Sequence, residues 1–269
     1  MKEMTDPYPI EYYKIESKPW TINLFRSKKK LSDIQESQIQ HISNAVLPIG
    51  IKNICGNDDR VKQNGTEHPY KIICRLIVID KSGYEWTGTG FFISPKCIIT
   101  SGHCVFFNNR WAKRIIVIPG DNGNSNRRPF GYDDSTKFKS VKGWTIHKNR
   151  DFDYGAVILK NDSLFKKINS HFETAILSDS QETIYNSGYT DEPNKRFEQW
   201  GDFGTVNKIS SHRIFYNNDT EKGNSGSPIL IKKGNVIKVV GIHSFGNCPN
   251  YAVRINSNIN KVWNEWKKL

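Results

Sequence analysis

The sequence predicts an all-β protein, a sandwich or barrel, closed by one helix at the C-terminus. From Asn53 onward, short apolar runs alternate with clusters of Gly, Pro and Asn, which is typical of many short strands rather than of βαβ units. At the C-terminus, Ile259, Val262, Trp263 and Trp266 fall on one face of a helix. The 269 residues, 36% of them hydrophobic, are enough to bury one large or two modest cores.

The predicted strands are short apolar segments bounded by turn residues. They cover residues 70–79, 88–93, 97–101, 114–118, 155–160, 183–189, 204–209, 212–216, 228–231, 236–243 and 251–255. Apolar residues in 1–52 are too dispersed for a folded unit, so we interpret that segment as a leader or prosegment. It shows no signal peptide, since residues 1–40 alternate polar and apolar positions. No apolar run approaches the roughly 18 residues of a membrane span, so we expect no membrane association.

The charge and the cysteines narrow the function classes. Lys and Arg number 39 against 27 Asp and Glu, a net charge of +12 that favours acidic partners in general. Without the basic and aromatic pattern of a stacking platform, we expect no nucleic-acid binding. The five cysteines are an odd number without a CxxC pair, so we expect no zinc and no other cofactor, and at least one unpaired thiol.

Three segments carry residues suited to nucleophilic catalysis, and they occur in the order His, Asp, Ser. They are Ser101-Gly102-His103-Cys104, Asp151-Phe152-Asp153-Tyr154-Gly155-Ala156-Val157 and Gly223-Asn224-Ser225-Gly226-Ser227-Pro228. A Gly two residues before a Ser lets successive backbone N–H groups point into one concavity, which suits a developing oxyanion. A serine nucleophile also needs a base for its proton and an acid that orients the base.

With these segments the chain resembles the trypsin-like serine peptidases, and within them the bacterial glutamyl endopeptidases of the V8 kind. The resemblance covers residue 54 to about residue 266 and is also carried by Gly56–Arg60, Pro69-Tyr70, Gly88–Phe91, Pro129–Tyr132, Gly143-Trp144, Ser187–Tyr189, Gln199-Trp200, Asp219-Thr220 and Gly241–His243. It implies two six-stranded antiparallel β-barrels of the chymotrypsin type with a C-terminal helix. The barrels would cover about 53–165 and 166–269 of a peptidase domain, 53–269.

The resemblance also implies roles for single residues. Ser225 corresponds to the nucleophile, His103 to the general base and then acid, and Asp153 to the group that orients His103. The N–H groups of Gly223 and Ser225 correspond to the oxyanion hole. Asp151 competes for the acid role, but Asp153 directly precedes the apolar strand 155–160, as the family's buried Asp does.

A P1 carboxylate that enters a pocket must regain hydrogen bonds lost to water. The resemblance implies that the substrate-binding residues are Thr220, His243, Ser244 and Gly246. Ser244 also matches a serine that donates to the buried Asp in the wider group. Asp219 conflicts with a glutamate pocket, because it stands where trypsin-like enzymes place the base that selects Lys or Arg. We expect cleavage after Glu, with Asp as a weaker P1 residue; Lys or Arg preference and a catalytically silent binding domain are the alternatives.

Maturation follows from the same resemblance. Asn224 stands where trypsin-like zymogens have the carboxylate that binds the new N-terminal ammonium, and the glutamyl group places that amine at the pocket instead. We expect cleavage after Lys52 by a peptidase with basic P1 preference, a secreted, monomeric product, and protein or peptide substrates. A Cys55–Cys248 bridge is one possible pairing, while Cys104 lacks the family's usual partner about 16 residues earlier.

Overall fold

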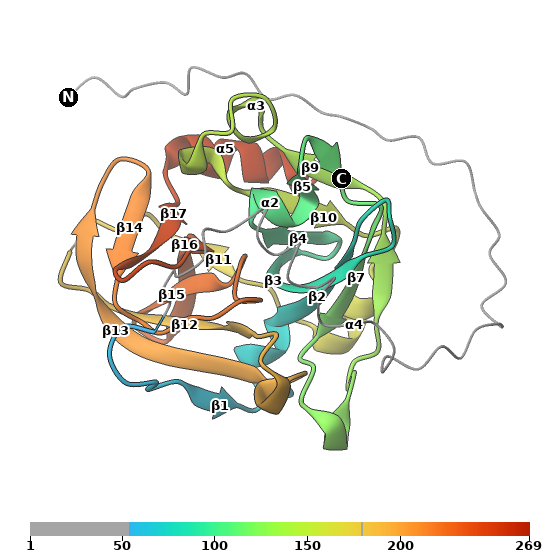
Figure 1. Ribbon diagram of the computed structural model, residues 1–269, viewed down its shortest axis with the longest axis horizontal. Coiled ribbons are helices and arrows are strands. Elements are labelled where there is room, and N and C mark those ends of the chain that lie inside the picture. The colour runs from blue at the N-terminus through green and yellow to red at the C-terminus, as the bar shows by residue number, and fades with distance from the viewer. Residues whose placement is uncertain (1–53, 179) are drawn as a thin grey trace, which may run out of the picture.

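The computed structural model describes residues 54–178 and 180–269, and two mainly antiparallel sheets form the framework of this part of the chain (Figure 1). The predicted leader, 1–52, and Asn53 lie outside the described residues. None of the helices in the described ranges combines the length and the apolar character of a membrane-crossing helix.

The first sheet has seven strands in the order β8-β7-β2-β3-β4-β10-β9. Their bounds are β2 Ile73–Ile79, β3 Glu85–Ser94, β4 Cys97–Thr100, β7 Arg114–Pro119, β8 Asp133–Ser135, β9 Phe138–Ser140 and β10 Gly155–Ile158. The two edge strands, β8 and β9, are separated only by Thr136 and Lys137, so one bent stretch of chain borders both edges. Ser135 Oγ and the Lys137 carbonyl both bond the backbone of Ile158, which draws these edges together.

The second sheet closes into a six-stranded barrel. Its order is β1-β13-β12-β15-β16-β17-β14, and β14 pairs back onto β13. The bounds are β1 Val61–Gln63, β12 Thr183–Tyr189, β13 Gln199–Ile209, β14 Arg213–Tyr216, β15 Pro228–Lys233, β16 Val236–Phe245 and β17 Asn250–Arg254, with β11 Glu173–Thr174 added beside β16. The predicted chymotrypsin-type architecture is confirmed.

Short helices and a two-stranded ribbon connect these strands. They are η1 Tyr70–Ile72, α2 Gly102–Val105, β5 Phe106–Phe107, β6 Arg110–Trp111, η2 Asn124–Asn126, α3 Lys142–Thr145, η3 Arg150–Phe152, α4 Ser163–Ile168 and η4 Pro193–Lys195. The predicted strand 70–79 therefore begins as one 3₁₀ turn, and the strand predicted at 204–209 is the second half of β13. The strands that the sequence did not predict are only two or three residues long, too short for a visible alternation.

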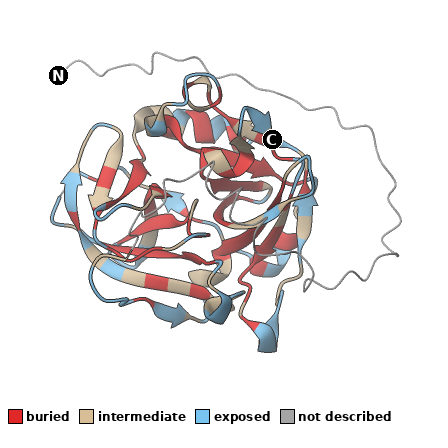
Figure 2. Ribbon diagram, viewed as in Figure 1, coloured by how far each residue is buried: buried red, intermediate tan, exposed pale blue. Residues whose placement is uncertain are grey.

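The C-terminal helix, α5 (Ser257–Trp266), buries the face that its sequence predicts. Asn256 caps it, since its side chain accepts the N–H of Ile259 at 3.0 Å. The helix follows the last strand of the second barrel but packs on the first sheet, where Trp263 lies 6.3 Å from Phe91 between ring centroids. It therefore joins the two sheets, whose inward faces form the buried core (Figure 2).

Candidate active site

His103 and Asp153 face each other at one end of the paired strands β4 and β10. His103 lies on α2, just after β4, and Asp153 lies just before β10. Because β4 and β10 pair antiparallel, with Thr100 opposite Gly155, the end of one strand lies beside the start of the other. His103 Nδ1 is 2.7 Å from Asp153 Oδ2, and the backbone N–H of His103 donates to Asp153 Oδ1 at 2.8 Å.

The Asp153 carboxylate is buried, with 3% of the residue exposed, and it receives a third hydrogen bond from the Ser244 hydroxyl. The close approach depends on a glycine, because a Cβ atom on Gly102 would lie 3.0 Å from Asp153 Oδ1 and 2.8 Å from the Trp144 ring. Asp153 is thus fixed from three sides, and it fixes the ring of His103 in turn.

Asp151, the competing acid, has a different partner. Its Oδ1 accepts from Arg213 Nε at 2.6 Å, and 29% of its side chain is exposed. The structure therefore places Asp153, and not Asp151, against the imidazole of His103.

The carboxylate of Asp153 changes the titration of His103. Burial disfavours the protonated ring, but the charge and hydrogen bond of Asp153, together with the neighbouring Cys104, outweigh burial, so the pKa of His103 lies well above its usual range. About a quarter of the His103 side chain remains exposed, which leaves the ring accessible from the surface.

Ser225 lies in a tight turn between two glycines with positive φ, Gly223 at +101° and Gly226 at +91°. Only glycine adopts these angles without strain. The turn is bound to the first sheet, because the N–H of Thr89 donates to the Ser225 carbonyl at 2.8 Å. The thiol of Cys104, the residue after His103, lies 3.8 Å from the same carbonyl oxygen. The turn therefore brings Ser225 beside the segment that carries His103.

The peptide before Gly223 is oriented by its carbonyl. The Lys222 carbonyl accepts the N–H of Asp191 at 2.9 Å. In a trans peptide the N–H points opposite to the C=O, so the N–H of Gly223 is directed away from Asp191. Among the described residues, no backbone carbonyl accepts this N–H.

The N–H of Ser225 is oriented in the same way, by the carbonyl of the residue before it. The Asn224 carbonyl accepts both the N–H and the hydroxyl of Ser227, at 2.9 and 2.6 Å. The amide side chain of Asn224 is also satisfied locally: it donates to the Tyr189 carbonyl at 2.9 Å and accepts from the Glu221 N–H at 2.7 Å. The turn is thus held without a carboxylate at position 224.

His243 and Thr220 are both buried, at 3% and 1% exposure. His243 Nδ1 lies 2.6 Å from Tyr216 Oη. Burial, with a further contribution from the nearby His103, lowers the pKa of His243 to about 3 although Asp153 opposes the shift. Within the described ranges, Thr220 Oγ1 has no hydrogen-bond partner. A buried hydroxyl without a partner is costly unless a ligand supplies one.

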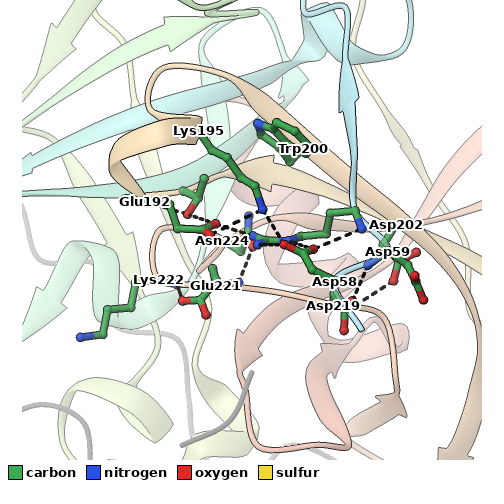
Figure 3. Close-up of polar contacts among 12 residues, drawn as sticks. Asp58, Asp59, Glu192, Lys195, Trp200, Asp202, Asp219, Glu221, Lys222 and Asn224 are labelled. Carbon is green, nitrogen blue, oxygen red and sulfur yellow. Dashed lines mark hydrogen bonds and ion pairs between the residues drawn. The ribbon is translucent and has the colours of Figure 1, made fainter. Parts of the chain in front are cut away.

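The carboxylate of Asp219 binds backbone N–H groups of the first described residues. Its two carboxylate oxygens accept the backbone N–H groups of Cys55 at 2.6 Å and Asp59 at 2.9 Å. Its own N–H donates to Asp202 Oδ2 at 2.8 Å (Figure 3). Asp219 is only 5% exposed, so its carboxylate is committed to segment 55–59.

The cysteines fall into one bridge and three buried thiols. The bridge joins Cys55 to Cys248, with the two Cα atoms 5.4 Å apart. The free thiols are Cys74, Cys97 and Cys104. Gly88 of β3 lies beside Cys104, at the spacing where the family's usual partner stands.

Gly246 directly follows β16 and is half-buried. Two residues that contact the site were not singled out from the sequence, Tyr216 and Asp202. Tyr216 lies within a correctly predicted strand, but its contact with His243 spans 27 positions. No local pattern reveals such a contact.

Comparisons with known proteins place the chain in a family. The sequence model of the trypsin family, described as "Trypsin", matches residues 62–263. An "Extracellular metalloprotease" of Bacillus subtilis is 30% identical over 213 residues, 77% of this chain and 67% of the relative. A "Glutamyl endopeptidase" of Bacillus licheniformis is 28% identical over 257 residues, 90% of this chain and 78% of the relative. The described residues hold no group of three or more His, Cys, Asp or Glu positioned to share a metal ion.

Solved structures share the fold. A Glu endopeptidase in complex with MPD gives a TM-score of 0.71 at 23% identity, covering 81% of this chain and 100% of its own. The protease Anisep of Arthrobacter nicotinovorans gives 0.66 at 14% identity, covering 78% and 100%. The chain belongs to the trypsin family, and within it is a serine endopeptidase related to the V8-like glutamyl endopeptidases.

Proposed function

We propose that the protein is a glutamyl endopeptidase in which Ser225, His103 and Asp153 act as one catalytic unit. One observation carries the proposal: Asp153 holds His103 through both the ring and the backbone, at 2.7 and 2.8 Å. The Ser225 turn is bound beside the same segment, through Thr89. A base fixed in this tautomer presents Nε2 as the proton acceptor.

The reaction then follows the serine peptidase sequence. Ser225 Oγ attacks the carbonyl carbon of the scissile peptide while its proton passes to His103 Nε2, and the carbonyl electrons move onto oxygen. The N–H groups of Gly223 and Ser225 donate to this oxyanion. His103 then gives the proton to the departing amine as the C–N bond breaks, and water repeats the two steps to release the acid.

His243 and Thr220 are the proposed readers of the P1 carboxylate. His243 stays neutral above about pH 3, so it binds an anion by a hydrogen bond and not by charge. We assign Tyr216 as donor to His243 Nδ1, which leaves the hydrogen on Nε2 for the substrate. Thr220 Oγ1 supplies a second donor. Ser244 and Gly246 complete this side of the proposed site, and Asp binds less well because its shorter side chain reaches these donors less closely.

The position of Asp219 supports Glu over Lys or Arg. Its oxygens are 2.6 and 2.9 Å from the N–H groups of Cys55 and Asp59, so it has little free capacity for a substrate cation. The same contacts support maturation at Lys52, because they bring the chain that follows Asn53 next to Thr220. The proposal includes an activating peptidase with basic P1 preference, a monomeric enzyme and secretion, the last supported by the similarity to an extracellular protease of Bacillus subtilis.

Cleavage of a peptide library by the full chain and by a chain that starts at Asn53 tests the proposal. We expect cuts after Glu, fewer after Asp, and a sharp rise in kcat/KM for the shorter chain. Ser225→Ala should lower kcat about 10⁴-fold or more and abolish labelling by a serine-directed phosphonate. Cuts after Lys or Arg would contradict the glutamate assignment and make Asp219 the base of the P1 pocket. Equal kcat/KM for the full chain and the chain that starts at Asn53 would mean that residues 1–52 do not inhibit the enzyme.

A further inference from the structure

Four arginine side chains gather where two surface loops meet, and we call them the arginine cluster: Arg75, Arg127, Arg128 and Arg196. Three of them lie over one aromatic ring, that of Phe197. The guanidinium carbon is 3.7 Å from the ring centroid in Arg127, 4.9 Å in Arg75 and 5.5 Å in Arg196. Stacking on an aromatic face holds the planar guanidinium in a fixed orientation.

The two loops are bound to each other beneath the cluster. The N–H of Gly123 donates to the Phe197 carbonyl at 2.8 Å, and a Cβ atom on Gly123 would lie 3.1 Å from Glu198 Oε1. Phe197 has a φ of +67°, which is rare for a bulky residue. Such a conformation persists only where the surroundings enforce it. The ring is therefore held in place as a platform.

Few carboxylates neutralise these arginines. Asp121, which is fully buried, accepts Arg75 Nε at 2.7 Å and the backbone N–H of Arg128 at 3.1 Å. Asp191 is the other acidic neighbour, and its carboxylate bonds Thr87. The cluster thus keeps an excess of positive charge.

The remaining acids nearby are paired elsewhere. Glu192 and Glu198 bind cations of the segment that leads into and forms β1, at 2.8 and 2.6 Å. Figure 3 shows Glu192 together with Lys195 and Asp58. Across the described ranges, neither Arg127 nor Arg196 forms an ion pair with a carboxylate, and both are exposed.

The buried member of the cluster has an unmet donor. The Arg75 side chain is 5% exposed, and its Nη2 has no hydrogen-bond partner among the described residues. The pKa of Arg127 is lowered by partial desolvation and by repulsion from Arg75, Arg128 and Arg196, against the attraction of Asp121. Both features are relieved by a bound anion.

The arginine cluster is connected to the proposed oxyanion turn. The loop that carries Arg196 follows β12, and near its start the N–H of Asp191 donates to the Lys222 carbonyl in the proposed oxyanion turn. Of the two proposed P1 readers, His243 lies on β16, and Thr220 lies two residues before Lys222. The arginine loop thus leaves from the oxyanion side of Ser225, and Thr87, which bonds Asp191, lies on the strand beside that turn.

We propose that the arginine cluster binds acidic side chains of a peptide substrate that follow the scissile bond. The inference rests on the proposed function and extends it from the P1 residue to the leaving segment. Guanidinium forks bind carboxylates in two-point contacts, and their orientation on Phe197 reduces the entropy lost on binding. An acidic segment after the cleaved Glu would meet Arg127 and Arg196 first.

The test compares two fluorogenic peptides with the same single glutamate site. One peptide carries a short tail of D-aspartate after the glutamate site, and the other carries a tail of D-asparagine there. The D-residues keep the tail itself from being cleaved. For the chain starting at Asn53, we expect the acidic tail to raise kcat/KM about fivefold at low salt and little at high salt. Arg127→Gln with Arg196→Gln should remove this advantage and leave the D-asparagine peptide unchanged. The control variant is Arg114→Gln, at an exposed arginine that starts β7, whereas the loop with Arg127 follows the end of β7. This control should keep the rate advantage of the acidic tail.

The outcomes separate the two proposals. Equal rates for both tails in the unaltered chain, or an advantage that survives in the double variant, would overturn the role of the cluster. An equal advantage from a tail placed before the glutamate would overturn the assigned side. If neither peptide is cleaved, the proposed function fails instead, and anisotropy of the labelled acidic peptide on Ser225→Ala still tests the cluster. If a single-stranded DNA oligonucleotide binds through Arg127 and Arg196 more tightly than the acidic peptide does, the ligand of the cluster is nucleic acid and the proposal is wrong.

Discussion

A Cβ atom on Gly88 would lie 3.0 Å from Cys104 Sγ. Standard disulfide bond lengths and angles place a Cβ about 3.0 Å from the sulfur across the bond. The two positions therefore have the geometry of the bridge that this chain lacks, with a glycine where the second cysteine would be.

Gly88→Cys should accordingly form a disulfide with Cys104 under air oxidation. The new loop is short, and chain-entropy estimates give about 3 kcal/mol of added stability as an upper value. Intact mass and thiol titration would detect the bond, and the urea midpoint would report stability. Gly88→Ser is the control without a cross-link; a variant that retains all free thiols after oxidation would contradict the geometry.

The two neighbouring acids offer a matched pair of variants. Asp153→Asn removes the carboxylate that holds His103, and we expect kcat to fall about 10⁴-fold, as in serine peptidases generally. Asp151→Asn breaks only a half-exposed pair with Arg213, so kcat should stay within about twofold. Steady-state kinetics on a glutamyl peptide decides between them, and similar losses in both variants would refute the assignment.

Tyr216→Phe removes the hydroxyl that binds His243 without changing the size of the ring. Losing one hydrogen bond of this kind costs about 1 kcal/mol, so kcat/KM for a Glu substrate should fall roughly fivefold. A substrate with Gln at P1 should lose less, because its side chain carries no charge. Tyr84→Phe, at a tyrosine that stacks on Trp86, serves as the control. A uniform loss on both substrates would indicate a structural effect only.

His243 should make stability fall in acid. Its pKa in the folded protein is about 3, below the ordinary value of 6.5, so the unfolded chain takes up a proton that the folded chain refuses. The stabilisation is fully present above pH 6.5 and is lost as the pH falls towards 3. Urea unfolding of wild type and His243→Gln across this range checks the prediction, since the variant should show a shallower decline. Identical slopes would mean that His243 does not titrate in this way.

The sequence could predict the residues whose partners are set by local chain geometry. The Ser225 turn follows from its two glycines, and the burial of Trp263 and Trp266 follows from helical spacing. The sequence favours Asp153 over Asp151 because a strand starts just after Asp153, and the pairing of β4 with β10 places Asp153 beside His103.

What the sequence could not predict depends on contacts between distant segments. The hydrogen bonds of Asp219 with Cys55 and Asp59 depend on the path of residues 55–59 over the second barrel, and no sequence motif predicts that path. The arginine cluster likewise draws on β2 and on two loops, at Arg75, Arg127 and Arg196, so its members look scattered along the chain. The strands β8 and β9 escaped prediction because each has three residues.

The Cys55–Cys248 bond has a topological consequence. It closes a covalent ring across 193 positions, and His103, Asp153 and Ser225 all lie on that ring. A single cut of the backbone at any exposed loop within it would leave one molecule, with both new ends still tethered. The ring means that one such cut opens a loop without separating Ser225 from His103.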